Sequence, residues 1–188
     1  MVSRIPARVL TDVLNPFVIF TALFLAAALA QAAVTQALLY TGVELLAAAT
    51  VAGYVLLMRR RARVKDFWIS ARAERLTPAL FLLAAFVALL GALAFLGAPA
   101  DLLLLTLSMG LASAAVAFVT LFFKASAHCA VAGHAAGAGL LLLGPLGIIF
   151  LLALPLVVWA RISLGAHTVL ETLAGTGVGI GFALLFLV

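Results

Sequence analysis

Long apolar stretches alternate along the chain with short polar connections. Seven apolar segments can be marked, at residues 14–34, 36–58, 78–97, 101–123, 127–143, 146–160 and 167–187. A helix that crosses a bilayer needs about 20 mostly apolar residues, which most of these segments supply. The fifth and sixth are short and are separated only by Gly-Pro-Leu-Gly at 144–147, which predicts a tight helical hairpin. We therefore expect an all-α, polytopic membrane bundle of six to seven transmembrane helices, forming a single domain over residues 1–188.

The composition excludes an ordinary soluble protein. The chain is 68% hydrophobic and 9% charged, whereas soluble domains are about 45–50% apolar and about 25% charged. The single cysteine, Cys129, excludes an internal disulfide. The net charge is +5, but basic residues of membrane proteins collect on cytoplasmic loops and beside anionic headgroups. The partner we expect is the lipid bilayer, and not a nucleic acid.

The basic residues are all expected on one side of the membrane. With seven spans, the N-terminus and the connections near 59–77, 124–127 and 161–166 share a side, together with all 11 lysines and arginines. The positive-inside rule makes that side cytoplasmic. We expect an integral protein of a prokaryotic cytoplasmic membrane. The basic start and first apolar segment could be a cleaved signal peptide, but the segment is longer than most signal h-regions, which favours an uncleaved anchor.

Two polar clusters on this side are candidates for anion binding. Lys65, Arg72 and Arg75 would share one stripe if residues 65–78 were helical. The alternative for this cluster is a basic amphipathic loop that only touches anionic lipid. Lys124, Ser126 and His128 crowd the start of the fifth span, where free backbone N–H groups favour an anion. The alternative there is a snorkelling lysine, a capping serine and a packed histidine.

A third cluster joins a histidine to a carboxylate. His167 and Glu171 are four residues apart, so a helix places them within hydrogen-bonding reach. A carboxylate on one ring nitrogen fixes the tautomer and leaves the other nitrogen free to attack. Arg161 precedes them and offers a fork-shaped donor to phosphate oxygens. The alternative is a purely structural pair. Glycines with G-x-x-x-G spacing follow and permit close helix contact, at positions Gly175, Gly177, Gly179 and Gly181.

Taken together, the clusters favour phosphoryl transfer without a metal. A nucleophile, a proton donor and a cationic cradle for the developing charge are all available on one face. His128, His134 and Glu171 could be imagined as metal ligands, but none shows a short ligand spacing such as H-x-x-x-H. We therefore expect neither a metal nor another cofactor.

The order of these motifs resembles the type 2 phosphatidic acid phosphatase superfamily, whose vanadium haloperoxidase relatives share its phosphate pocket. The family pattern is Lys-x6-Arg-Pro, then Pro-Ser-Gly-His, then Ser-Arg-x5-His-x3-Asp. Lys65 and Arg72 reproduce the first spacing, with Ala73 in place of proline. Ala-Ser-Ala-His at 125–128 stands in the second position and keeps the serine and histidine.

The third motif is also matched in this chain. Arg161 and His167 keep its spacing, with Ala160 in place of serine and Glu171 in place of aspartate. Arg75 competes with the arginine of the first motif, because Arg-Leu-Thr-Pro also leads to a proline. The resemblance runs in order from about residue 60 to 183 and implies a phosphatase/haloperoxidase-like helical core.

The resemblance also implies a mechanism. His167 would attack phosphorus and form a phosphohistidine, Glu171 would orient it, and His128 would protonate the leaving oxygen. The opposed protonation states of the two histidines predict a bell-shaped pH–rate profile. The implied substrate is a lipid phosphate: phosphatidate, phosphatidylglycerophosphate, or a polyprenyl mono- or diphosphate. The residues that would hold the phosphate oxygens are Lys65, Arg72, Arg75, Lys124, Ser126 and Arg161.

Two other functions are compatible with the same sequence. Glu44 and His134 lie inside apolar segments and could relay protons in a transporter or flippase. The chain could also bind lipid phosphates without catalysing any reaction.

Overall fold

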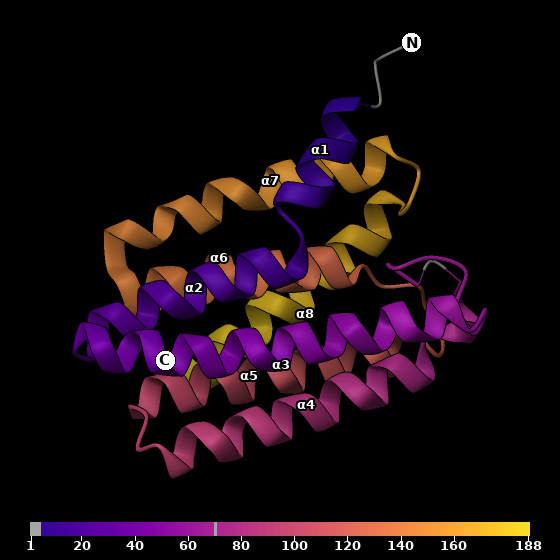
Figure 1. Cartoon of the computed structure of the whole chain (residues 1–188). Helices are drawn as coiled ribbons and strands as arrows, with labels where there is room; N and C mark the ends of the chain where they lie inside the picture. Colours follow the sequence, from indigo (N-terminus) through magenta and orange to yellow (C-terminus); the bar gives the residue numbers. More distant parts are fainter. Residues whose placement is uncertain (1–4, 70) are drawn as a thin grey trace.

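The computed structural model describes residues 5–69 and 71–188, without the side chain of Arg72 (Figure 1). The described residues form helices and no strand. The chain order of these elements is α1 (Ile5–Val13), α2 (Pro16–Gln31), α3 (Val34–Arg60), η1 (Arg72–Glu74), α4 (Leu76–Phe95), α5 (Ala100–Val119), α6 (Ala127–Leu143), η2 (Gly144–Gly147), α7 (Ile148–Ser163) and α8 (Val169–Leu187).

The predicted all-helical fold is confirmed for the described residues, and its apolar helices fit a polytopic membrane bundle; the six to seven spans expected compare with five or six candidates. In the described chain, five stretches are long and apolar enough to cross a membrane: α3, α4, α5, the stretch from α6 to α7, and α8. The pair α1–α2, bent by 43°, would make a sixth. Within the stretch from α6 to α7, η2 turns the chain back on itself, so α7 returns beside α6 as the predicted hairpin (Figure 1).

The helix α1 was not predicted from the sequence. Its nine residues are too few and too polar to form an apolar span. Asn15 separates it from α2 by accepting a hydrogen bond from the Val18 N–H at 3.1 Å, and Pro16 then occupies the first turn of α2. Both residues are typical of a helix start, so they end α1 and begin α2.

Small residues allow α6 and α8 to pack with their backbones in contact. A Cβ atom at Gly175 would overlap the carbonyl of Ser126, and one at Gly179 would overlap the carbonyl of Ala130. By contrast, Gly177 and Gly181 have open space where a Cβ would stand. Only one of the two overlapping G-x-x-x-G pairs therefore makes the helix contact.

This difference predicts that alanine substitutions at Gly179 and Gly181 have unequal effects on stability. We expect Gly179→Ala to lower the free energy of unfolding by about 1–3 kcal/mol or more, because the added methyl group overpacks a backbone contact. Gly181→Ala should be neutral or stabilising, since alanine favours a helix more than glycine does. Thermal unfolding of both variants in detergent micelles measures the difference. Equal effects of the two substitutions would contradict the packing described here.

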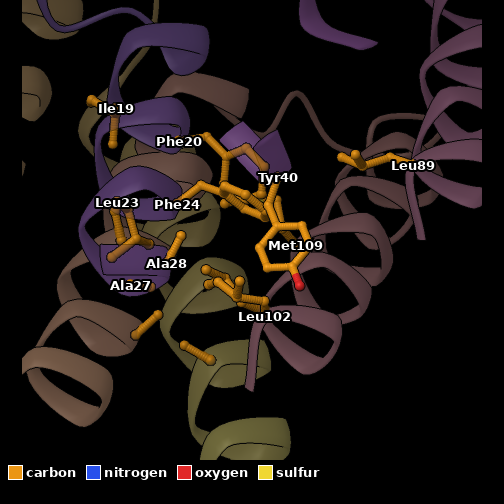
Figure 2. Close-up of a cluster of buried hydrophobic side chains, with 14 of the residues drawn as sticks. Ile19, Phe20, Leu23, Phe24, Ala27, Ala28, Tyr40, Leu89, Leu102 and Met109 are labelled. Atoms are coloured by element: carbon orange, nitrogen blue, oxygen red, sulfur yellow. The ribbon is translucent and has the colours of Figure 1, made fainter. Parts of the chain in front are cut away.

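The polar connections gather at one end of the bundle, as the sequence predicted. The α3–α4, α5–α6 and α7–α8 connections lie together in Figure 1, at the right of the view. Deeper in the bundle, aromatic and aliphatic side chains from several helices pack into a core, part of which Figure 2 shows. The labelled side chains include Phe20 and Phe24 of α2, Tyr40 of α3, and Leu102 and Met109 of α5.

Candidate active site

The α7–α8 connection holds His167 in one orientation. Thr168 caps α8: its hydroxyl accepts from the Glu171 N–H at 3.3 Å, and the Glu171 carboxylate accepts from the Thr168 N–H at 3.1 Å. The same carboxylate oxygen lies 2.9 Å from Nδ1 of His167. An Nδ1–H that donates to this carboxylate leaves the lone pair of a neutral imidazole on Nε2. The predicted His–Glu pair is therefore present.

Arg161 is tied to His167 through the backbone. The carbonyl of Arg161 accepts from the N–H groups of Ala166 and His167, at 3.1 and 3.3 Å. Gly165 closes this turn with a φ of 65°, a left-handed conformation that favours glycine. The Arg161 side chain is buried, and among the described residues its Nε has no hydrogen-bond partner. A buried guanidinium N–H without a partner is a donor available to a ligand.

The α5–α6 connection is fastened to the same turn. Lys124 donates from Nζ to the carbonyl of Ala166 at 2.9 Å, and the Ser126 N–H donates to the carbonyl of Glu171 at 3.1 Å. The Ser126 hydroxyl is fully buried and caps α6 by accepting from the Cys129 N–H at 3.4 Å. In this structure Ser126 therefore acts as a helix cap and does not line the cavity described below.

His128 lies in the first turn of α6, within electrostatic range of both Arg161 and His167. Among the described residues, its buried Nε2 has no hydrogen-bond partner. The edge of the Trp68 ring packs against the imidazole, with ring centroids 4.7 Å apart. The sequence did not predict this contact, because Trp68 lies in the α3–α4 connection, 60 residues before His128 in the chain.

The α3–α4 connection does not form the helix that would align its three cations. Ala62 and Ile69 adopt left-handed φ values of 53° and 51°, which a continuous right-handed helix excludes. Arg75 donates from Nε to the carbonyl of Ile69 at 3.0 Å and lines the cavity. The Lys65 side chain is exposed and is not part of the cavity wall. The prediction for the Arg72 side chain lies outside the described part of the chain.

The three connections enclose the polar end of a cavity of about 870 Å³. We call this end the mouth; its titratable side chains are Arg75, Lys124, His128, Arg161 and His167. Of the acidic residues that the structure describes, only Glu44 lines the cavity, and it belongs to the middle of α3. Among the described residues that line the mouth itself, three are cations and none is a carboxylate, although Asp66 and Glu171 act on Arg161 and His167 from outside the wall. A low-dielectric recess focuses the potential of such charges. The mouth therefore suits an anion.

Burial sets the protonation state of His167. Loss of water contact lowers the pKa of His167 to about 4, and the nearby charges of Arg161 and Lys124 act in the same direction. The hydrogen bond to Glu171 opposes this shift without cancelling it. His167 is therefore a neutral imidazole at pH 7, with an unprotonated Nε2.

We expect the His167 ring to titrate near pH 4, well below the ordinary value of about 6.5. As the pH falls, the unfolded chain takes up this proton before the folded protein does. The free energy of unfolding should therefore decrease between about pH 6.5 and pH 4, with no further contribution from His167 below that range. Ring signals in an NMR titration, assigned with His167→Gln, measure the value directly. Titration at or above pH 6.5 would contradict the burial of this imidazole.

Two other buried polar groups have hydroxyl partners. Glu44 accepts from the Thr21 hydroxyl at 2.9 and 3.1 Å. His134 is fully buried, and its Nε2 lies 2.8 Å from the Ser108 hydroxyl, away from the cavity wall. Among the described residues, no three His, Cys, Asp or Glu side chains gather as a metal site would need.

Comparison of the chain with protein-family models, with curated proteins and with solved structures finds no match. The function is therefore inferred from the residues at the mouth and from their geometry.

Proposed function

We propose that this chain is a metal-independent lipid phosphatase related to the type 2 phosphatidic acid phosphatase superfamily. The observation that supports the proposal is that the candidate catalytic and cationic side chains lie together at the mouth of one cavity. There, His167, oriented by a carboxylate, and His128, whose Nε2 has no partner in the described part of the chain, accompany three cations. Each group matches a need of phosphoryl transfer: a nucleophile, an acid, and positive charge for the equatorial oxygens.

In the first step, Nε2 of His167 attacks phosphorus and forms a P–N bond while the ester P–O bond breaks. The leaving oxygen takes a proton from His128. The negative charge of a bound phosphate favours the protonated form of His128 before this transfer. The proton on Nδ1 of His167 remains there throughout and is donated in a hydrogen bond to Glu171. The carboxylate stabilises the imidazolium that attack on phosphorus produces.

In the second step, water attacks the phosphohistidine. The now neutral His128 accepts a proton from this water, and cleavage of the P–N bond restores His167 and releases phosphate. Arg161, with its buried and partly unpaired guanidinium, would hold two phosphate oxygens. Arg75 and Lys124 add charge at the mouth, and Lys65, Arg72 and Ser126 are assigned to phosphate binding by the resemblance alone.

An amphiphilic substrate fits the surroundings of the mouth. The cationic mouth adjoins a wall that is mostly apolar, so the phosphate should belong to a lipid such as phosphatidate, phosphatidylglycerophosphate or a polyprenyl phosphate or diphosphate. In this proposal the mouth faces the cytoplasm of a prokaryote, which the positive-inside rule favours for the arginine-rich α3–α4 connection.

A panel of these lipid phosphates, presented to the purified protein in detergent with EDTA, tests the proposal. We expect phosphate release that resists EDTA. Strict dependence on added Mg²⁺ would contradict the histidine mechanism. Saturable binding of lipid phosphates without phosphate release would instead support a non-catalytic binding protein.

A further inference from the structure

The cavity extends far beyond the phosphate-binding mouth. On α4, its wall runs from Arg75 at the mouth to Leu89. This interval of 14 residues corresponds to about 21 Å at ~1.5 Å per helical residue. The part of the wall contributed by α5 and its C-cap runs from Thr120 near the mouth down to Met109. The cavity is therefore a deep recess between helices and not a shallow surface site.

The wall between mouth and deep end suits a hydrocarbon chain. Aliphatic and aromatic side chains from three helices face it, among them Val51 and Val55 of α3, Leu82 and Phe86 of α4, and Val116 of α5. Apolar walls with a few convergent polar groups at one end are typical of sites for amphiphilic ligands. Because the wall continues directly from the cationic mouth, one molecule can occupy both.

The recess ends on packed side chains, which we call the floor: Phe20, Leu89 and Met109. Their exposed fractions are 6%, 5% and 2%, so each touches the cavity with little of its surface. Phe24 and Leu102, both fully buried, belong to the same core (Figure 2). Among the described residues that line the cavity, none lies beyond Leu89 on α4 or before Met109 on α5, so the recess ends at this core.

The carboxyl group of Glu44 lies near the depth of the floor. Tyr54 of α3 stacks on Phe81 of α4, with ring centroids 3.9 Å apart. Because the two helices are joined by one connection and run in opposite directions (Figure 1), Glu44, ten residues before Tyr54, falls close to the level of Leu89. Its side chain is 3% exposed and held by Thr21. Methylene groups that reached it would pack against a polar group, which is unfavourable.

We infer that this cavity encloses the hydrocarbon tail of the substrate and that its floor sets the longest tail that is accepted. The inference rests on the proposed phosphatase function for the identity of the head group. An extended peptide has three backbone bonds per residue and spans at most about 3.5 Å per residue. Dividing one by the other gives about 1.2 Å per bond, which we apply to an extended hydrocarbon chain. A recess of about 21 Å then holds roughly 17–18 bonds, phosphoester included. One acyl chain of a phosphatidyl substrate, or a polyprenyl chain of about this length, would occupy the recess.

A series of straight-chain alkyl monophosphates tests the limit. We expect kcat/KM to hold or rise with chain length up to roughly 17–18 bonds, then to fall about tenfold within a few further methylenes, because longer chains overpack the floor. Met109→Ala should move this break to longer chains by roughly two to three bonds, the length of the side chain it removes. Leu89→Ala should move the break in the same direction, and it replaces Met109→Ala as the test if that variant folds poorly.

Leu23→Ala is the matched control. Leu23 is fully buried in the same core but does not line the cavity, and Figure 2 shows it on the opposite side of the cluster from Leu89. This truncation should lower stability and leave the break where it is. Turnover without a break, or a break that neither floor variant moves, would overturn the tail site.

Binding of non-hydrolysable alkyl phosphonates separates the two proposals. If no alkyl phosphate is hydrolysed but phosphonate affinity shows the same break, shifted by Met109→Ala, the phosphatase proposal fails and the tail site stands. If phosphonate affinity shows no break, the tail site is contradicted whether or not phosphate is released.

Discussion

Replacing His167 by alanine should lower kcat/KM for lipid phosphate hydrolysis by roughly 10⁴–10⁶, the scale seen when a nucleophile is removed from a cooperating set of catalytic groups. No other described group at the mouth is available as the nucleophile. Glu171 is engaged with Thr168 and His167, and His128 must supply the proton of the leaving group. Substrate affinity should change far less than kcat, because the cations at the mouth remain.

His134→Ala is the control for this loss. Like His167, His134 is a buried imidazole with a side-chain partner, the Ser108 hydroxyl at 2.8 Å. It does not line the cavity, so its removal should destabilise the protein without changing kcat of the folded fraction. Activity measured per folded molecule, with both variants compared at the same temperature, separates chemistry from stability. If His167→Ala retained more than roughly 1% of the wild-type rate, the histidine mechanism would be wrong.

Arg161→Gln should lower kcat/KM by about 10²–10³, the usual cost of removing one donor that stabilises charge in the transition state. The buried guanidinium is the only one at the mouth with an Nε that lacks a partner among the described residues. The substitution keeps the backbone carbonyl that accepts from Ala166 and His167, so the turn should persist. Arg161→Lys should recover only part of the rate, because lysine cannot form a two-pronged contact with phosphate.

Steady-state kinetics of both Arg161 variants, with Arg63→Gln beside them, measure this effect. Arg63 is an exposed residue of the α3–α4 connection that does not line the cavity, so its replacement removes one positive charge without touching the mouth. We expect less than about a threefold change in that variant, consistent with screening of exposed charges. Similar losses at positions 63 and 161 would show that net charge matters and that the geometry of the guanidinium does not.

The helices could be predicted from the sequence because a bilayer demands long apolar segments. The fifth segment, expected at residues 127–143, matches α6 residue for residue, and the second, expected at 36–58, falls within α3. The contact between His167 and Glu171 could also be predicted, since residues four apart on a helix are neighbours whatever the rest of the chain does. The short helix α1 escaped prediction because it lacks the length and apolar character that made the others visible.

Contacts between distant segments were beyond the reach of sequence spacing. Ser126 was expected at the phosphate, but the meeting of α6 with the start of α8 buries it as a helix cap. Trp68 packs on His128 only because the α3–α4 connection folds inward, away from the expected helix. The deep apolar recess belongs to no single segment, since α2, α3, α4 and α5 each supply part of its wall.

Trapping of the phosphorylated intermediate tests the central claim most directly. The protein would be mixed with a lipid phosphate in EDTA, quenched in alkali, which preserves a P–N bond, and digested for mass spectrometry. We predict phosphate on His167 of the wild-type protein and none in His167→Ala. Turnover in EDTA with no phosphate on His167, or with phosphate on another residue, would contradict the mechanism.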